Sequence, residues 1–221
     1  MADFNYKDIG IIDYQKCWDY QELLLQEIRD EKTNRRQPVP TNYFLLVEHP
    51  HVYTLGKSGN RNNLLIQDEF LKKIEASYVS INRGGDITYH GPGQLVGYPI
   101  IDLEYYRIGV REYVERMERA IIKVVAAYGI QSGLKEGAVG IWIDSETVKA
   151  RKIAAIGVRV SRYVTMHGFA LNVNTDMRYF SYINPCGITA YGVTSLEKEL
   201  GRKVDMNEVK QLVREKFNSE Y

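Results

Sequence analysis

Residues 83–103, RGGDITYHGPGQLVGYPIIDL, constrain the fold of this chain more than any other stretch. They place five glycines and two prolines between two apolar runs that are typical of strands. A simple hairpin turn needs one or two such residues, so this many favours a backbone that turns tightly. Glycine also lets the backbone come close to a bound molecule. We therefore predict that this stretch forms a binding surface.

Length and charge limit the classes of protein to which the chain can belong. Its 221 residues are enough for one large hydrophobic core, and no composition shift divides them, so we predict a single domain over residues 1–221. Lys and Arg number 29 and Asp and Glu 28, a balance that gives no overall attraction to nucleic acid or to membranes. We therefore expect no nucleic-acid partner and no membrane association.

The N-terminus and the cysteine content indicate a reducing compartment. The first residues lack a basic start followed by an apolar block, and no apolar run is long enough to cross a membrane. The two cysteines do not make a disulfide framework. The expected location is the cytoplasm.

Short runs rich in β-branched residues predict several strands. Residues 43–48 are almost continuously apolar, as is typical of a strand that is covered on both faces. Other strands are expected at 52–55, 79–81, 88–89, 94–101, 140–144, 153–160 and 164–173. The last three follow one another through short turns, which predicts an antiparallel meander.

Helical periodicity predicts the remaining elements. Residues 14–29 carry an apolar stripe behind Asp13, a plausible N-cap, and the polar residues 30–41 are expected to form a loop. Residues 110–128 repeat apolar side chains at helical spacing and end before Gly129. A short helix is expected at 68–76, and a C-terminal helix after Asp205.

Cys186 is the sharpest candidate for chemistry. It lies in Asn-Pro-Cys-Gly, between two residues that break regular structure, whereas Cys17 falls on the buried stripe of a helix and is expected to fill the core. A free thiol with a pKa of ~8.5 is mostly protonated near neutral pH, so a nucleophilic cysteine needs a neighbouring cation or base. The residues alone leave open whether Cys186 is a nucleophile and which side chain would serve it.

Other polar residues have two interpretations each. Lys152 opens a strand of small and apolar residues, where a surface charge is the ordinary explanation. His90 and His167 lie beside glycines, so each is either a hydrogen-bonded structural histidine or a residue that a ligand approaches. His49 and His51 flank Pro50 without further ligands of suitable spacing, so we predict no metal site.

Several stretches together resemble the lipoyl(octanoyl) transferases. The matching residues, in the order of the family, are EHPHVYTLG (48–56), RGGDITYHGPGQ (83–94), YPIIDL (98–103), KIAAIG (152–157), HGFALNVN (167–174) and NPCGI (184–188). They span most of the chain. The resemblance is specific because it includes both KIAAIG, the lysine box, and NPCGI, the cysteine box. Residues 33–41 look longer than the family usually needs.

The resemblance implies an acyltransferase of lipoate cofactor biosynthesis. Such an enzyme moves an octanoyl group from octanoyl-acyl carrier protein to a lysine of the lipoyl domains of 2-oxoacid dehydrogenases or of the glycine cleavage H protein. The resemblance implies no cofactor and no metal. The implied fold is the α/β (α+β) fold of the biotin and lipoate protein ligases, a mixed, largely antiparallel sheet flanked by helices.

The resemblance also assigns roles to individual residues. Cys186 would form the acyl-thioester intermediate, and Lys152 would be its partner. The acyl-substrate site would be lined by Arg83, Gly84, Gly85, Asp86, Ile87, Thr88, Tyr89, His90, Ala155, Ile156, Gly157, Gly168, Phe169 and Ala170.

Three alternatives are open at this point. An ATP-dependent lipoate or biotin ligase of the same fold would need an adenylate site and no cysteine. A transferase that moves octanoyl between two lipoyl-dependent proteins would also use cysteine, but with another donor. A module that only binds acylated carrier protein would have no use for Lys152 and Cys186 together.

Overall fold

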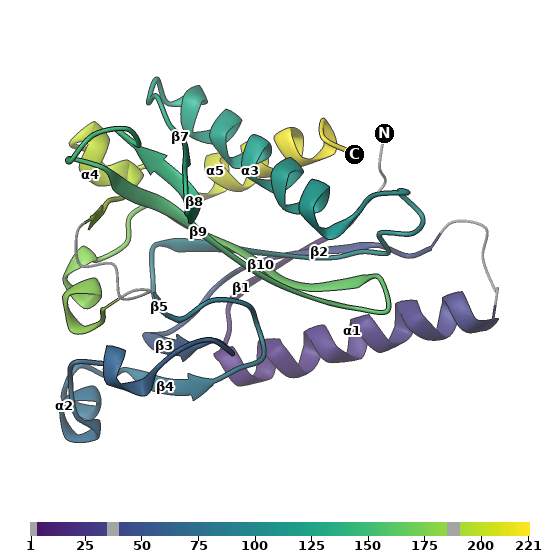
Figure 1. Cartoon of the computed structure of the whole chain (residues 1–221), viewed down its shortest axis with the longest axis horizontal. Coiled ribbons are helices and arrows are strands. Elements are labelled where there is room, and N and C mark those ends of the chain that lie inside the picture. Colours follow the sequence, from purple (N-terminus) through teal and green to yellow (C-terminus); the bar gives the residue numbers. More distant parts are fainter. Residues whose placement is uncertain (1–3, 35–39, 185–190) are drawn as a thin grey trace.

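A computed structural model describes residues 4–34, 40–184 and 191–221. Within these residues, eight strands form the main sheet (Figure 1). Its order is β1 (Asn5–Ile11), β2 (Tyr43–Glu48), β6 (Gln94–Ile100), β10 (Val164–Asn172), β9 (Arg151–Ser161), β8 (Ala138–Ile143) and β7 (Gly133–Lys135), with β11 (Gly192–Val193) beside the start of β9. A smaller sheet has the order β4 (Ser77–Ser80), β3 (Val52–Leu55) and β5 (Ile87–His90).

Most of the strand pairs are antiparallel. In the main sheet only β1 with β2 and β9 with β11 are parallel among the described residues. The predicted meander is β8, β9 and β10, and it pairs as expected. The prediction of a mixed, largely antiparallel sheet flanked by helices is therefore confirmed.

Helices cover both faces of the main sheet. The helix α1 (Tyr14–Asn34) lies on one face together with the smaller sheet, and α3 (Val110–Ala127) and α5 (Met206–Asn218) lie on the other (Figure 1). The shorter helical segments are α2 (Asp68–Lys73), α4 (Leu196–Leu200), η1 (Arg61–Asn63) and η2 (Met177–Tyr182).

The strand β2 shows why its sequence is apolar throughout. Because successive side chains of a strand point to opposite faces, Phe44 and Leu46 enter the core under α3 and α5. Tyr43, Leu45 and Val47 enter the core under α1. Both faces of the strand are buried, as the sequence predicts.

The helix α1 begins as expected but ends later. The Asp13 carboxylate accepts a hydrogen bond from the Lys16 N–H at 3.1 Å, which caps the first turn. The helix then continues to Asn34, so the prediction of a loop from residue 30 is wrong. The reason is a contact outside the helix, since the Lys32 ammonium lies 2.7 Å from carboxylate oxygens of both Asp102 and Glu104.

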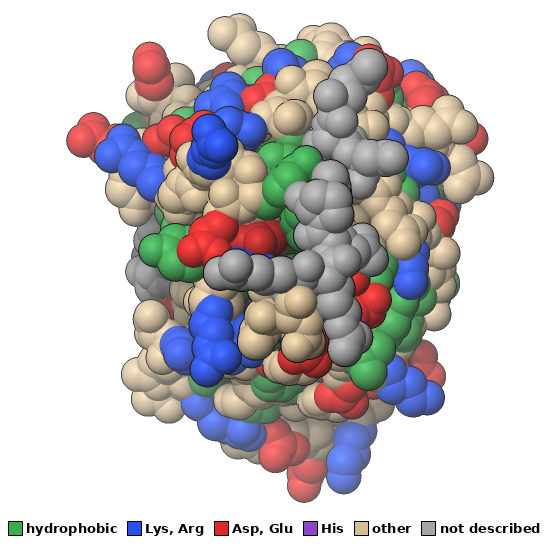
Figure 2. Space-filling model, turned by 90° about the vertical axis from the view of Figure 1, so that its right-hand side faces the viewer, with side chains coloured by type: hydrophobic (Ala, Val, Ile, Leu, Met, Phe, Trp, Pro, Cys, Tyr) green, Lys and Arg blue, Asp and Glu red, His purple; other side chains and the backbone are tan. Residues whose placement is uncertain are grey.

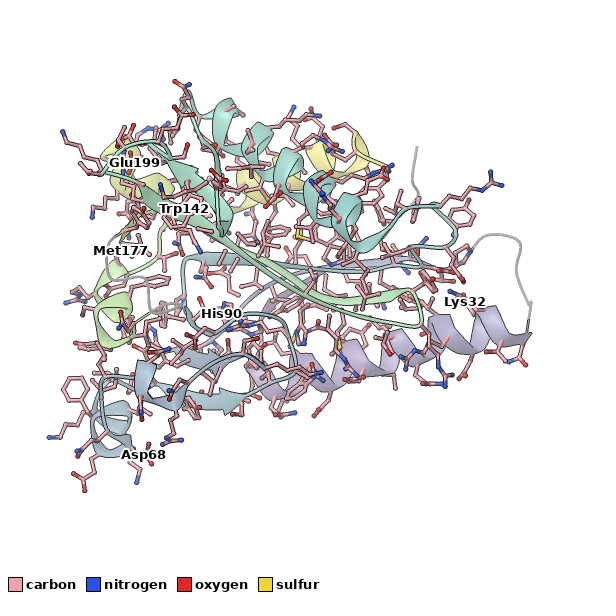
Figure 3. All side chains as sticks on the ribbon, viewed as in Figure 1. Lys32, Asp68, His90, Trp142, Met177 and Glu199 are labelled. Atoms are coloured by element: carbon pink, nitrogen blue, oxygen red, sulfur yellow. The ribbon has the colours of Figure 1, made fainter. Side chains whose placement is uncertain are left out.

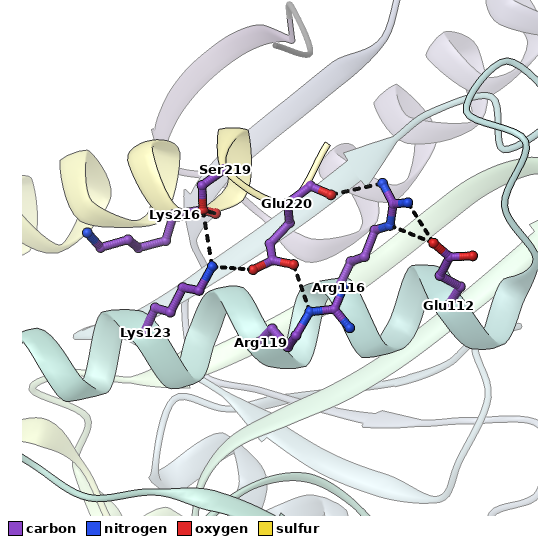
Figure 4. A network of polar contacts seen from close by, with 7 residues as sticks. All are labelled: Glu112, Arg116, Arg119, Lys123, Lys216, Ser219 and Glu220. Atoms are coloured by element: carbon purple, nitrogen blue, oxygen red, sulfur yellow. Dashed lines mark hydrogen bonds and ion pairs between the residues drawn. The ribbon is translucent and has the colours of Figure 1, made fainter.

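The C-terminal residues are held against α3 by charged groups. Glu220 accepts from Lys123 at 2.5 Å and from Arg119 at 2.8 Å, and its carbonyl oxygen accepts from Arg116 (Figure 4). The predicted helix after Asp205 is α5, and the Asp205 carboxylate caps its start. The residues after the end of α5 are therefore fixed against α3 as well.

The sequence did not predict β1, which forms an edge of the main sheet. Its pairing with β2 is parallel and shifts register between Asp8 and Gly10. Such a strand has no hairpin partner nearby in the sequence, so its local pattern carries little signal.

The surface mixes charges of both signs. Figure 2 shows basic and acidic side chains interspersed on the face that it presents. Among the described residues, no helix combines the length and apolar character that crossing a membrane would require.

Gly168 in β10 provides a test of the strand packing. A Cβ on Gly168 would lie 2.1 Å from the Gly97 carbonyl oxygen of β6, so Gly168→Ala forces two backbones apart. We expect the substitution to lower the free energy of unfolding by about 2 kcal/mol or more, measured by urea denaturation. Gly133→Ala is the control, because a Cβ there meets only the Ser145 hydroxyl, at 3.8 Å. Equal stability of the two variants would contradict the close packing of β10 against β6.

Candidate active site

A cavity of about 490 Å³ lies beside β9 and β10 of the main sheet. Its lining comes from β5, β6, β8, β9 and β10, together with Tyr14 at the start of α1. The volume is in the ordinary range for small-molecule sites. Aliphatic and aromatic side chains make up much of the wall, which suits a hydrocarbon chain.

Nearly all of the residues predicted to line an acyl site do line this cavity. They are Arg83, Gly84, Gly85, Asp86, Ile87, Thr88, His90, Ala155, Ile156, Gly157, Gly168, Phe169 and Ala170. Three segments that are far apart in the sequence therefore meet at one place. A contact of these residues with substrate stays a prediction.

Tyr89 is the member of the predicted set that does not line the cavity. Its ring is buried and stacks on Tyr179 with 5.0 Å between ring centroids, and its hydroxyl is hydrogen-bonded to His51 at 2.7 Å. Thr88 and His90, whose side chains alternate with that of Tyr89 along β5, do line the cavity. Tyr89 thus belongs to the core of the smaller sheet.

Arg83 shapes the loop that closes one side of the cavity. Its buried guanidinium donates to the carbonyl oxygens of Thr54 at 2.8 Å, Gly84 at 2.9 Å and Asp86 at 2.7 Å. The loop reaches the main sheet through the Gly84 N–H, which donates to the Val158 carbonyl oxygen at 3.1 Å. Gly85 has a φ of +88°, a conformation that glycine adopts without strain.

His90 is a hydrogen-bonded histidine in the cavity wall. Its Nδ1 lies 2.7 Å from the Gln94 side-chain oxygen, and because that oxygen only accepts, Nδ1 carries the proton. Gln94 donates in turn to Asn172, which donates to the Thr194 carbonyl oxygen. Burial, and then the neighbouring His49, hold the pKa of His90 well below its usual range. The ring is therefore neutral near pH 7.

His167 occupies a strained position on β10. Its φ is +60°, and its backbone N–H donates to the Gln21 side chain on α1 rather than to a neighbouring strand. Its Nε2 lies 2.9 Å from the Asn82 side-chain oxygen, while Nδ1 has no hydrogen-bond partner among the described residues. Burial lowers its pKa to about 3.

In the segment His49-Pro50-His51, the first histidine is held by hydrogen bonds to the rest of the protein. The ring nitrogens of His49 contact the Ile12 carbonyl oxygen and the Tyr98 hydroxyl, both at 2.8 Å, and burial lowers the pKa of this histidine to about 4. The described residues hold no group of three or more His, Cys, Asp or Glu side chains that is placed to hold a metal ion.

Lys152 lies, partly buried, in the cavity wall at the start of β9. Its ammonium lies 4.8 Å from the ring centroid of Trp142. Its carbonyl oxygen accepts from the Thr194 N–H at 3.0 Å, and β11 pairs with β9 beside it. The strands on both sides therefore hold its backbone in place.

Cys186 lies outside the described residues, but the chain on both sides of it is anchored. The Asn184 N–H donates to the Asn63 carbonyl oxygen at 2.7 Å, and the Gly192 N–H donates to the Ala150 carbonyl oxygen at 3.1 Å. Tyr191, Gly192 and Val193 line the cavity.

Cys17 has the structural role expected from the sequence. It is buried in the core under α1, and burial raises its pKa to about 12. A thiol with such a pKa is protonated near neutral pH and is a poor nucleophile. The prediction that Cys17 fills the core is confirmed.

Sequence reasoning missed several residues of the cavity. Trp142, Gln94 and Asn172 all line it, and the first contacts Lys152. The two amides lie on strands buried on both faces, where a polar side chain needs a partner. That burial pattern is a signal that could have pointed to them.

The fold defines the class of protein. A model of the lipoyl protein ligase A/B catalytic domain matches residues 13–218. A lipoate protein ligase of Thermoplasma acidophilum with bound lipoic acid has a TM-score of 0.69 at 14% identity, over 99% of this chain and 86% of that one. A biotin protein ligase from Aquifex aeolicus in complex with biotin and ATP has a TM-score of 0.57 at 14% identity, over 98% and 69%. The chain has the fold of these ligases.

Closer sequence relatives define the family. An octanoyltransferase of Flavobacterium johnsoniae is 55% identical over 212 residues, which are 94% of this chain and 91% of the relative. An octanoyltransferase of Bacteroides fragilis is 54% identical over 204 residues, 92% and 91% of the two chains. The chain belongs to the octanoyltransferase family and is an acyltransferase, so the family predicted from the sequence motifs is confirmed.

The buried histidines predict a dependence of stability on pH. The folded pKa values of His49 and His167 are about 4 and about 3, below the unfolded value of ~6.5, so the unfolded chain binds more protons as the pH falls below 6.5. Each histidine should therefore lower the free energy of unfolding by about 1.5 kcal/mol between pH 6.5 and pH 5.

Urea denaturation at those two pH values tests this expectation. His49→Gln should reduce this loss of stability by about 1.5 kcal/mol, because the variant has one fewer proton to bind on unfolding. His51→Gln is the control and should reduce it less, since His51 is less buried. An unchanged pH dependence in His49→Gln would contradict the neutral buried state of His49.

Proposed function

We propose that this chain transfers octanoyl groups in lipoate biosynthesis through a thioester on Cys186. In the first step, the Cys186 thiolate attacks the thioester carbonyl of octanoyl-acyl carrier protein, and the carrier leaves as its thiol with a proton from the Lys152 ammonium. In the second step, the amine of a lysine on a lipoyl domain attacks the acyl-cysteine. An amide forms, the proton of the amine passes to the neutral Lys152, and Cys186 is released as its thiolate.

The position of Lys152 carries this proposal. It lies in the wall of an apolar cavity, at the start of a strand that pairs with residues 192–193 just after the cysteine box. An ammonium near a thiol favours the thiolate. The same lysine, once neutral, takes a proton from the attacking amine in the second step.

The energetics of the two steps need no nucleotide. Exchange of one thioester for another changes the free energy little, and the final amide is more stable than the thioester that it replaces. The apolar wall of the cavity supplies binding energy, since burying about seven chain carbons at ~0.8 kcal/mol each contributes ~5 kcal/mol. We therefore assign no cofactor to the reaction.

The partners follow from the two steps. The donor is octanoyl-acyl carrier protein, and the acceptors are lipoyl domains of 2-oxoacid dehydrogenases and the glycine cleavage H protein. A solved structure of similar fold is that of a bipartite lipoate protein ligase and its E2 lipoyl domain from Thermoplasma acidophilum. We place the reaction in the cytoplasm, where acyl carrier protein and reduced thiols occur together.

Each of the three alternative functions predicts a different property of the protein. An ATP-dependent ligase would show nucleotide dependence, and the identity of 55% to an octanoyltransferase favours the transferase. A transferase between two lipoyl-dependent proteins would prefer an octanoylated protein domain as donor. A binding module would have no use for Lys152 and Cys186 together.

The first prediction concerns the covalent intermediate. Incubation with octanoyl-acyl carrier protein and no nucleotide should add one octanoyl group to the wild type, detected by intact mass. Cys186→Ala should form no adduct, because the attacking sulfur is gone. Cys17→Ala is the control and should still form it, since Cys17 is buried and protonated. Absence of the adduct in the wild type, or its persistence in Cys186→Ala, would refute the proposal.

The second prediction concerns Lys152. In the Cys17→Ala background Cys186 is the sole thiol, so its alkylation by iodoacetamide can be followed against pH. Lys152→Ala should raise the pKa of Cys186 by about one unit or more, because the nearby positive charge is removed. Lys152→Arg is the control and should keep part of the effect. Identical alkylation profiles for Lys152→Ala and its parent would exclude the pairing.

A further inference from the structure

Trp142 lies directly against the side chain of Lys152. It is on β8 (Figure 3), opposite Lys152 in the β8–β9 register, so the two side chains are on the same face of the sheet. The Lys152 ammonium is 4.8 Å from the centroid of the indole ring. A cation at this distance over an aromatic face is attracted by the negative charge density of the ring.

The indole ring is fixed from several sides. Its N–H donates to the Ala138 carbonyl oxygen at 2.9 Å, and only 3% of the residue is exposed. The Tyr191 ring packs edge-on against it, with 5.6 Å between centroids and an interplanar angle of 79°. A ring held in this way keeps its aromatic face in a fixed place beside the ammonium.

The stem of Lys152 is held by the same strand. Gly140 lies two residues before Trp142 on β8, and a Cβ there would come within 3.3 Å of the Cδ and Cε atoms of Lys152. The absence of a side chain at Gly140 therefore leaves space for the aliphatic stem, and Trp142 receives its charged end. Without such a cradle a lysine side chain adopts many conformations.

We propose that Trp142 is a positioning residue, which holds the ammonium of Lys152 at the cavity wall where the thiol of Cys186 needs it. The inference rests on the proposed function, because it assumes that Lys152 acts on Cys186. Trp142 acts through Lys152, since its ring supplies no group that could exchange a proton with the thiol.

Two substitutions separate the aromatic face from the other properties of the side chain. Trp142→Phe and Trp142→Leu both lose the hydrogen bond to Ala138, but only Phe keeps an aromatic face. In the Cys17→Ala background, Trp142→Leu should slow the alkylation of Cys186 near pH 7 about three- to tenfold and shift its profile to higher pH. Trp142→Phe should restore most of the rate. Leu134→Ala, on the neighbouring strand β7 (Gly133–Lys135) and exposed to solvent outside the cavity wall, is the control and should leave the profile unchanged.

A double-mutant cycle with Lys152→Ala shows whether Trp142 acts through the lysine. Once Lys152 is replaced, adding Trp142→Leu should have no further effect on the alkylation profile. An effect of equal size in both backgrounds would overturn the proposal, as would Trp142→Phe and Trp142→Leu behaving alike. Thermal unfolding of each variant separates a loss of fold from a loss of position, since a merely structural residue would lower stability without moving the pH profile.

The outcomes also separate this inference from the proposed function. If the wild type forms no octanoyl adduct, the proposed function fails, whatever Trp142 does. If the adduct forms and Lys152→Ala shifts the alkylation profile but Trp142→Leu does not, only the role of Trp142 fails.

Discussion

The buried guanidinium of Arg83 connects the two sheets, and the cavity depends on it. A charge removed from water is costly unless it is well hydrogen-bonded. Here the carbonyl oxygens of Thr54 on β3, Gly84 and Asp86 accept from it. These bonds set the shape of the loop that reaches Val158 on β9 through the Gly84 N–H. The cavity lies between this loop and the strands β9 and β10, so its wall exists only while the loop keeps that shape.

The register of β9 then places the chemistry in that cavity. Lys152 pairs with Trp142 of β8 on one side and with Val193 of β11 on the other. The Arg151 guanidinium contacts Glu199 of α4 and so holds the segment after β11 against the start of β9. A buried chain of hydrogen bonds from His90 through Gln94 and Asn172 ends at the Thr194 carbonyl oxygen, while the Thr194 N–H bonds to Lys152. The polar residues of the site are thus coupled through strand pairing.

Much of the fold could be predicted because local periodicity reports burial. The continuous apolar run in β2 and the helical spacing in α3 each reflect faces that the structure does bury. The predicted end of α1 was wrong because Lys32 pairs with Asp102 and Glu104, which are distant in the sequence. The strand β1 was missed because its parallel partner is also distant. Tyr89 was placed in the acyl site because its neighbours in the motif line the cavity, although its own side chain points into the core of the smaller sheet.

The sequence by itself determined the family and the chemical groups at hand, since the lysine and cysteine boxes and the glycine-rich stretch are properties of the covalent chain. It also determined which faces of the strands and helices are apolar. The tertiary structure alone decided that Lys152 lies against Trp142, that His90 is neutral with its proton on Nδ1, and that Arg83 binds backbone carbonyls. The physical reason is that these contacts depend on strand register and on burial. Both are settled by packing between residues far apart in the chain, which no local pattern encodes.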